Sequence, residues 1–259
     1  MVRFVAFAAL ALALAGCIGQ GDDGFTAANL TGRSFSGLAP TVLSTNSAGG
    51  PVGNAPVAVA FDADGKARIQ INTVVTDLIF NSGFGGYVDA TGRIGLLVGT
   101  KVAGAPPTPD ILYLSVLDTT SSFADQAMFL VVGNNTLPAQ LPSGGKASYT
   151  GRIFLLNGAG NSGLGDVSLE MNFPALELTG GFSAIFPTDS LAGIPANFQL
   201  VPAQVSGGSF STGLTSSDLT LITSNFSGSF FGTFGDQIGG TVLIRAIEGN
   251  AVGEFGAAD

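Results

Sequence analysis

The sequence predicts an all-β protein whose C-terminal part closes into a small eight-stranded antiparallel barrel. Glycine makes up 39 of the 259 residues and charged residues only 10%, against about 7% and 25% in average domains. No window shows a convincing helical period, and several segments alternate apolar with polar residues. This composition is typical of short strands joined by many turns.

A glycine-interrupted aromatic stretch near the C-terminus predicts a curved strand. Phe226, Phe230 and Phe234 recur at even spacing, with Gly228 and Gly232 between them. Side chains alternate between the faces of a strand, so all five share one face. Glycine permits a bend there and lets the ring of a neighbouring strand cover the backbone.

Residues 143–259 are predicted to form this barrel. Val167 to Phe173 alternates apolar residues with Ser, Glu and Asn, which is the pattern of a half-buried strand. Leu137 to Gly145 contains two prolines and two glycines and predicts a boundary before the barrel. About eight strands reach Phe255, a number at which side chains fill the interior or one small ligand fits inside.

Residues 25–142 are predicted to form a separate β-rich domain. Asp62 to Gly65 supplies turn chemistry between two apolar segments, and Asp89 to Gly92 does so again. Further strands are expected at Leu112 to Leu117 and at Ala127 to Val132, with loops before and after each of them. Ala105 to Asp110 is predicted to be a loop, since proline lacks the donor that a central strand needs.

The N-terminus predicts a lipid-anchored, exported protein. Residues 1–16 contain Arg3 and a short apolar run and form a signal peptide, which ends before Cys17 in the sequence Leu-Ala-Gly-Cys. This matches the bacterial lipobox, in which the cysteine thiol is acylated, so Cys17 is the predicted lipidation site and residues 17–24 a tether. The alternative is an ordinary secretory signal followed by an incidental free cysteine.

The charge balance restricts the partners. The net charge is −9, and without residues 1–16 it becomes −10, from 8 basic and 18 acidic residues. Such a surface repels phosphate backbones, so no nucleic-acid partner is expected. The chain has no Trp and three Tyr, too few for the aromatic girdles of a membrane-embedded barrel. A water-soluble barrel tethered to the membrane is therefore preferred.

Four motifs in the C-terminal half resemble the β-barrel domain of transferrin-binding protein B, a family of Gram-negative surface lipoproteins. They are Phe226 to Gly232, Gly239 to Thr241, Val252 to Gly256, and the upstream Gly144 to Gly151. The resemblance implies a single lobe at the outer membrane, on the cell surface, with residues 25–142 in the place of the family's handle domain. It also implies capture of a protein partner, and a cognate outer-membrane transporter or translocon beside it.

The residues that carry chemistry favour a binding protein over an enzyme. The chain has no His, which removes the usual general base and the commonest metal ligand. No cofactor or metal is therefore expected. Glu170 and Glu177 form a possible carboxylate pair, but they are expected on a solvated outer face. The glycines of 158–163 match a dinucleotide fingerprint, but a strand follows them, so a hairpin loop is predicted.

Two loops are predicted to contact the partner, Phe186 to Pro195 and Gly213 to Thr223. The candidate contact residues are Phe186, Asp189, Leu191, Ile194, Leu214 and Asp218. Two other functions stay open. The barrel could carry a small hydrophobic ligand or haem, with Tyr87, Tyr113 or Tyr149 as a possible iron ligand, or the protein could be a structural envelope lipoprotein.

Overall fold

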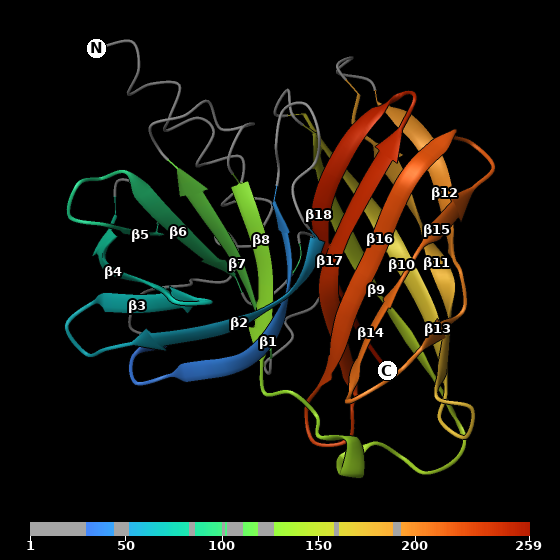
Figure 1. The fold of residues 1–259 in the computed structure, drawn as a ribbon, viewed down its shortest axis with the longest axis horizontal. Coiled ribbons are helices and arrows are strands. Elements are labelled where there is room, and N and C mark those ends of the chain that lie inside the picture. The colour runs from blue at the N-terminus through green and yellow to red at the C-terminus, as the bar shows by residue number, and fades with distance from the viewer. Residues whose placement is uncertain are drawn as a thin grey trace.

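The structure consists of two curved antiparallel sheets that lie side by side (Figure 1). The computed structural model describes residues 30–43, 52–82, 86–99, 102, 111–118, 127–157, 161–188 and 193–259. Within these ranges, no helix is long and apolar enough to cross a membrane. The predicted signal peptide, Cys17, the tether and the proline-rich loop lie outside the described residues.

The N-terminal sheet is a closed barrel of eight strands in chain order. The strands are β1 (Ser34–Leu43), β2 (Val52–Phe61), β3 (Lys66–Ile71), β4 (Val74–Asn81), β5 (Gly86–Val88), β6 (Ile94–Gly99), β7 (Ile111–Asp118) and β8 (Ala127–Gly133). The first strand closes the barrel by pairing with the last, with Val42 opposite Phe129. Both predicted hairpins are confirmed by strand pairing, with Phe61 opposite Ala67 and Val88 opposite Gly95. In the turns, Asp62 accepts bonds from the amides of Asp64 and Lys66, and Asp89 accepts bonds from the amides of Arg93 and Ile94.

The C-terminal sheet follows a 3₁₀ turn at Pro138–Gln140. Its strands are β9 (Lys146–Asn157), β10 (Ser162–Asn172), β11 (Glu177–Phe186), β12 (Ile194–Leu200), β13 (Ala203–Gln204), β14 (Ser209–Thr212), β15 (Leu214–Ser216), β16 (Leu221–Phe231), β17 (Gln237–Ala246) and β18 (Gly249–Ala258). The order is β14-β16-β17-β18-β9-β10-β11-β12-β15, with β13 beside β11.

One chain segment closes this second sheet. β14 pairs with β16 and β15 pairs with β12, and a single residue, Gly213, separates β14 from β15. At this point the Val201 amide donates to the Gly213 carbonyl (3.0 Å), and the Leu214 amide donates to the Ser224 hydroxyl (2.8 Å). Because β14 and β15 together form one staggered wall strand, the sheet is the predicted eight-stranded barrel with a seam.

Phenylalanine rings fill the interior of the C-terminal barrel. Phe226 stacks on Phe255 with ring centroids 4.0 Å apart, and Phe182 stacks on Phe198 at 4.5 Å. Gly228 and Gly240 lie opposite each other on β16 and β17 and make room for these rings. A Cβ atom on Gly240 would approach the Phe255 ring to 2.7 Å, and one on Gly228 the Phe210 ring to 2.5 Å. The predicted role of glycine beneath neighbouring rings is confirmed.

The aromatic strand ends earlier than the spacing predicts. β16 stops at Phe231, and Gly232 has φ 85°, which begins the turn into β17. Phe234 lies in that turn and is 67% exposed, so the expectation that it shares the inner face with Phe226 and Phe230 is wrong. The left-handed backbone at Gly232 breaks the alternation on which that expectation depended.

The outer walls of the two barrels pack directly on each other. β1 and β8 of the N-terminal barrel lie against β17 and β18. Side chains of β7 and β8 reach Gly239 and Gly256, which are outer positions opposite each other in the sheet. A Cβ atom on Gly256 would lie 1.8 Å from the Tyr113 hydroxyl oxygen, and one on Gly239 would lie 3.0 Å from Val131. These two glycines therefore let the barrels approach each other closely.

Glu254 is a buried carboxylic acid within this contact. It is fully buried on the outer face of β18, beside Thr241 on β17 and Phe154 on β9, and the Phe154 ring packs 6.2 Å from Phe129 of the other barrel. Neither carboxyl oxygen has a hydrogen-bond partner among the described residues. Burial raises the pKa of Glu254 to about 8, because a carboxylate is costly in apolar surroundings.

We expect the free energy of unfolding to fall as pH rises from about 4.5 to 8. The folded protein holds the Glu254 proton through this range whereas the unfolded chain releases it, so the slope is at most about 1.4 kcal/mol per pH unit. Glu254→Gln should flatten this part of the profile, measured by urea denaturation between pH 5 and 9. Glu170→Gln, at an exposed position, is the matched control and should keep the slope; parallel profiles for wild type and Glu254→Gln would contradict the assignment.

A candidate partner-binding end of the C-terminal barrel

Four connections meet at one end of the C-terminal barrel, the upper end in Figure 1. They join β9 to β10, β11 to β12, β15 to β16 and β17 to β18, and we call this surface the loop end. Antiparallel pairing brings them together, because alternate connections of a meander lie at the same end. The described parts of the two loops predicted as contacts that lie at the loop end are residues 186–188 and 193–195 of the first and residues 217–220 of the second.

The connection from β15 to β16 is held against β12 by Asp218. The Asn197 amide donates to Oδ2 of Asp218 at 2.7 Å, and the Asn197 side-chain amide donates to the same oxygen at 3.0 Å. Ser216 adds a bond to the Asn197 carbonyl (2.8 Å). The bonds from Asn197 hold the pKa of Asp218 below its ordinary value, so this exposed carboxylate stays ionised and the loop stays anchored.

A second anchor joins the same connection to the hairpin between β17 and β18. The Thr220 amide donates to both carboxylate oxygens of Glu248 at 3.2 Å, and the Ile247 amide donates to the Thr220 carbonyl at 3.0 Å. These bonds present two large apolar side chains to solvent, Ile222 at 71% exposure and Ile247 at 72%. Exposed apolar side chains supported by a fixed backbone are common features of protein interaction surfaces.

Sequence reasoning did not identify Ile222 and Ile247. Ile222 falls where the pairing of β16 with β17 shifts between Leu221 and Thr223. Such a bulge adds one residue and redirects a side chain that the alternation would otherwise place. The turn residues Glu248 and Gly249 beside Ile247 were the available signal, since they predict a hairpin tip.

The remaining loops at this end are also tied together. The Asn161 side chain donates to the Thr188 carbonyl at 2.7 Å and thereby joins the β9–β10 connection to the β11–β12 connection. Asn157 and Asn161 exchange two further bonds across the hairpin. The flanking strands pair antiparallel, with Ser162 opposite Leu156, so the glycine-rich motif of 158–163 joins the two strands of a hairpin, as predicted.

The six predicted contact residues have different surroundings. Phe186 and Leu214 are buried in the core and support the loops from below, and Ile194 is partly buried at the start of β12. Asp218 is exposed and anchors its loop. Asp189 and Leu191 lie outside the described residues. The loop end therefore combines buried apolar supports with exposed polar and apolar tips.

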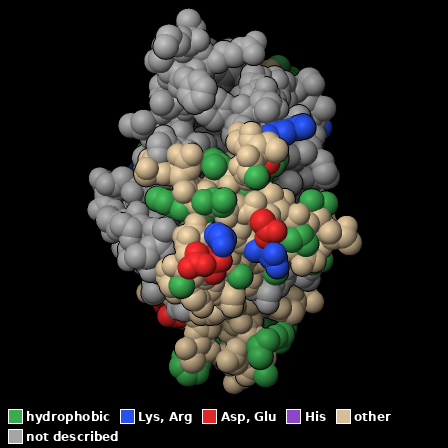
Figure 2. Space-filling view, turned by 90° about the vertical axis from the view of Figure 1, so that its left-hand side faces the viewer, with side chains coloured by type: hydrophobic (Ala, Val, Ile, Leu, Met, Phe, Trp, Pro, Cys, Tyr) green, Lys and Arg blue, Asp and Glu red, His purple; other side chains and the backbone are tan. Residues whose placement is uncertain are grey.

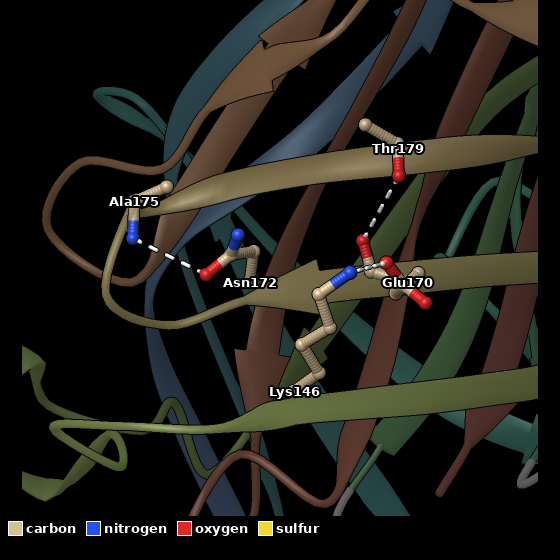
Figure 3. A network of polar contacts seen from close by, with 5 residues as sticks. All are labelled: Lys146, Glu170, Asn172, Ala175 and Thr179. Atoms are coloured by element: carbon tan, nitrogen blue, oxygen red, sulfur yellow. Dashed lines mark hydrogen bonds and ion pairs between the residues drawn. The ribbon is translucent and has the colours of Figure 1, made fainter.

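The carboxylate considered for catalysis, Glu170, forms a surface ion pair. Glu170 lies on the outer face of β10, where Lys146 donates to its carboxylate at 2.6 Å, and Thr179 lies beside it on β11 (Figure 3). This confirms the expected solvated face, and an exposed ion pair of this kind contributes about 0–1 kcal/mol. Among the described residues no group of three or more acidic, His or Cys side chains could hold a metal ion.

The three tyrosines are packed side chains. Tyr149 donates its hydroxyl proton to the Gly235 carbonyl at 2.6 Å, and burial raises its pKa. Tyr87 packs against Phe61 and Phe80 inside the N-terminal barrel, where burial raises its pKa to about 12. Tyr113 lies between the two barrels, over Gly256. Each is at most 1% exposed.

Comparison with solved structures identifies the fold. A transferrin-binding protein B variant from Haemophilus parasuis superposes with a TM-score of 0.53 at 14% identity, covering 85% of this chain and 45% of that protein. The fold is that of transferrin-binding protein B.

A second structure agrees with this fold. The isotype 1 transferrin-binding protein B from Neisseria meningitidis has a TM-score of 0.51 at 14% identity, covering 85% of this chain and 43% of that protein. The chain thus spans less than half the length of either protein. No family profile matches the sequence, and no curated protein matches it. The pair of barrel-like sheets is what is shared, whereas the sequence motifs predict only the C-terminal barrel.

We expect Asp218→Ala to loosen the β15–β16 connection without unfolding the barrel. The Asn197 amide loses its acceptor, so its hydrogen exchange should accelerate several-fold while exchange in β10 stays unchanged. In the wild type, acidification should release the anchor only as pH falls through the lowered pKa of Asp218, below the ordinary value of 3.8. Ser217→Ala, which removes a longer bond to Asp218 (3.3 Å), is the control; equal exchange in both variants would contradict this role.

Proposed function

We propose that this protein is a non-enzymatic surface lipoprotein of the Gram-negative outer membrane that captures a macromolecular partner through its loop end. The observation that carries the proposal is the fold of transferrin-binding protein B combined with an anchored loop end that exposes Ile222 and Ile247. The related structures are named for binding transferrin. For this chain the proposed partner is a protein, of the kind that carries iron or another nutrient.

The filled interior favours this function over a carrier of small molecules. A barrel that encloses a ligand needs space among its inward side chains, whereas here Phe182, Phe198, Phe226 and Phe255 stack across the centre. The buried, packed tyrosines also offer poor access to haem iron. Binding energy at the surface would instead come from apolar side chains within a polar rim.

The proposed location depends on acylation of Cys17. Acyl chains on one residue give a stable anchor, because each buried methylene adds about 0.8 kcal/mol. The two-barrel body would then stand outside the membrane beside a cognate transporter or translocon. A lipoprotein with a purely structural role in the envelope is the alternative, and protease treatment of intact cells distinguishes them, since a structural protein facing inward stays uncut.

We expect Cys17→Ser to abolish incorporation of labelled palmitate and to move the protein from the membrane to the soluble fraction. The lipobox has no acceptor once the thiol is replaced. Ser34→Ala, a hydroxyl removal in the folded body, is the matched control and should remain in the membrane fraction. Continued labelling of the Cys17→Ser protein would contradict lipid attachment at this residue.

We expect Ile222→Asp combined with Ile247→Asp to reduce partner capture by at least roughly tenfold, since loss of two apolar contacts costs about 1.4 kcal/mol or more. Immobilised wild-type and variant proteins would be exposed to fluids from the organism's surroundings, and bound proteins quantified by mass spectrometry. Phe234→Asp, at an equally exposed position on the opposite end of the barrel, is the matched control and should capture normally. Equal capture by all three would contradict binding at the loop end.

A further inference from the structure

The N-terminal barrel has an open strand edge on β4. Its strand partner on one side is β3, which pairs with Val74 to Ile79. On the other side β5 is only three residues long and pairs with Ile79 to Asn81. No described strand therefore pairs with 74–78 on the side away from β3, although the barrel is closed elsewhere.

The direction of the backbone groups on this edge follows from one hydrogen bond. The Phe80 amide donates to the Gly65 carbonyl at 2.8 Å, on the β3 side. Backbone groups alternate sides along an antiparallel strand, so those of Val74, Thr76 and Leu78 also face β3. The N–H and C=O groups of Val75 and Asp77 consequently point out of the sheet, toward the open side.

Apolar side chains accompany the open edge. Val74 is 67% exposed, Val75 51% and Ile79 54%. β-branched residues on an unprotected edge favour the addition of another strand, and soluble proteins usually avoid this arrangement by placing lysine or proline there. The edge sequence Val-Val-Thr-Asp-Leu-Ile has neither.

The charge around the edge is balanced. Arg68 of β3 pairs with Asp77, and Lys66 lies 3.8 Å from Asp64. Figure 2, which faces this side of the molecule, shows acidic and basic side chains next to each other among apolar ones. The chain as a whole carries −9, so a locally neutral patch is where two identical molecules can approach with little repulsion.

We propose that the β4 edge pairs with the same edge of a second copy of this chain. An antiparallel arrangement about a two-fold axis at Thr76 places Val75 of each copy opposite Asp77 of the other copy. It satisfies all the outward backbone groups of both residues with about four hydrogen bonds. The interface is isologous and needs no other component. Tethering at one membrane through Cys17 would raise the effective concentration of the copies.

Proline substitution tests the hydrogen bonds. Val75→Pro removes an outward N–H from each copy without touching the ladder to β3, and an edge strand tolerates proline. Val75→Thr keeps the N–H and the branched shape and is the matched control. Sedimentation velocity of the chain should show a concentration-dependent dimer for wild type and Val75→Thr, weakened roughly tenfold or more in Val75→Pro by the loss of two bonds.

Disulfide trapping tests the register independently, even where Val75→Pro lowers the melting temperature. Thr76 would lie opposite Thr76 of the second copy in a non-hydrogen-bonded pair, in which the two Cα atoms are about 4.5 Å apart. This distance falls within the range of about 4.4–6.8 Å that disulfides require. Thr76→Cys should form covalent dimers on mild oxidation. Ser183→Cys, exposed on the centrally placed β11, and the wild type should not.

Three results would overturn the proposal. They are a wild-type protein that stays monomeric at every concentration, a Val75→Pro protein that dimerises as well as wild type, and Thr76→Cys cross-linking no greater than that of Ser183→Cys.

Discussion

The contact between the two barrel walls is the constraint on which the rest of the structure depends. Barrels normally direct their outer positions to water, but here Tyr113, Phe129 and Phe154 lie on outer faces and are fully buried. Their burial is possible because Gly239 and Gly256 carry no side chains at the point of closest approach. The apolar area removed from water in this way stabilises both barrels together.

β17 and β18 serve two packing surfaces at once, which explains their composition. Gly240 faces inward beneath Phe255, while the adjacent Gly239 faces outward beneath Ile111 and Val131. On β16, Ser227 and Ser229 form hydroxyl pairs with Ser211 and Ser209 of β14 at 2.9 and 3.0 Å, with little exposure. Small residues on both faces therefore reflect two close neighbours, and they limit which substitutions either face tolerates.

Sequence patterns predicted most of the C-terminal barrel because short local patterns mark its strands. The alternation from Val167 to Phe173 marks β10, and glycines beside phenylalanines mark β16 to β18. The sequence did not predict closure of the N-terminal barrel, since the pairing of β1 with β8 joins residues that are far apart in the sequence. The burial of Glu254 was hidden for the same reason, because alternation gives the face of a residue but not what covers that face.

The sequence assigns the candidate site to two loops, 186–195 and 213–223, but does not single out the side chains that are exposed there. Antiparallel order brings the described ends of these two loops to one end of the barrel, and their contact with a partner stays a prediction. The exposure of Ile222 depends on a shift in strand pairing, and that of Ile247 on a hairpin geometry fixed by Glu248. Such details arise from tertiary hydrogen bonds, which no local pattern encodes.

The pairing of β9 with β18 also has a consequence for biogenesis. These are the first and last strands of the C-terminal barrel, and their register runs from Asn157 opposite Ala251 to Thr150 opposite Ala258. Ring closure must wait until about a hundred residues of intervening chain have been delivered, and such non-local topologies form slowly. Slow closure would leave the β9 edge without its neighbour until β18 has been synthesised, so this edge stays exposed to other strands for much of translation.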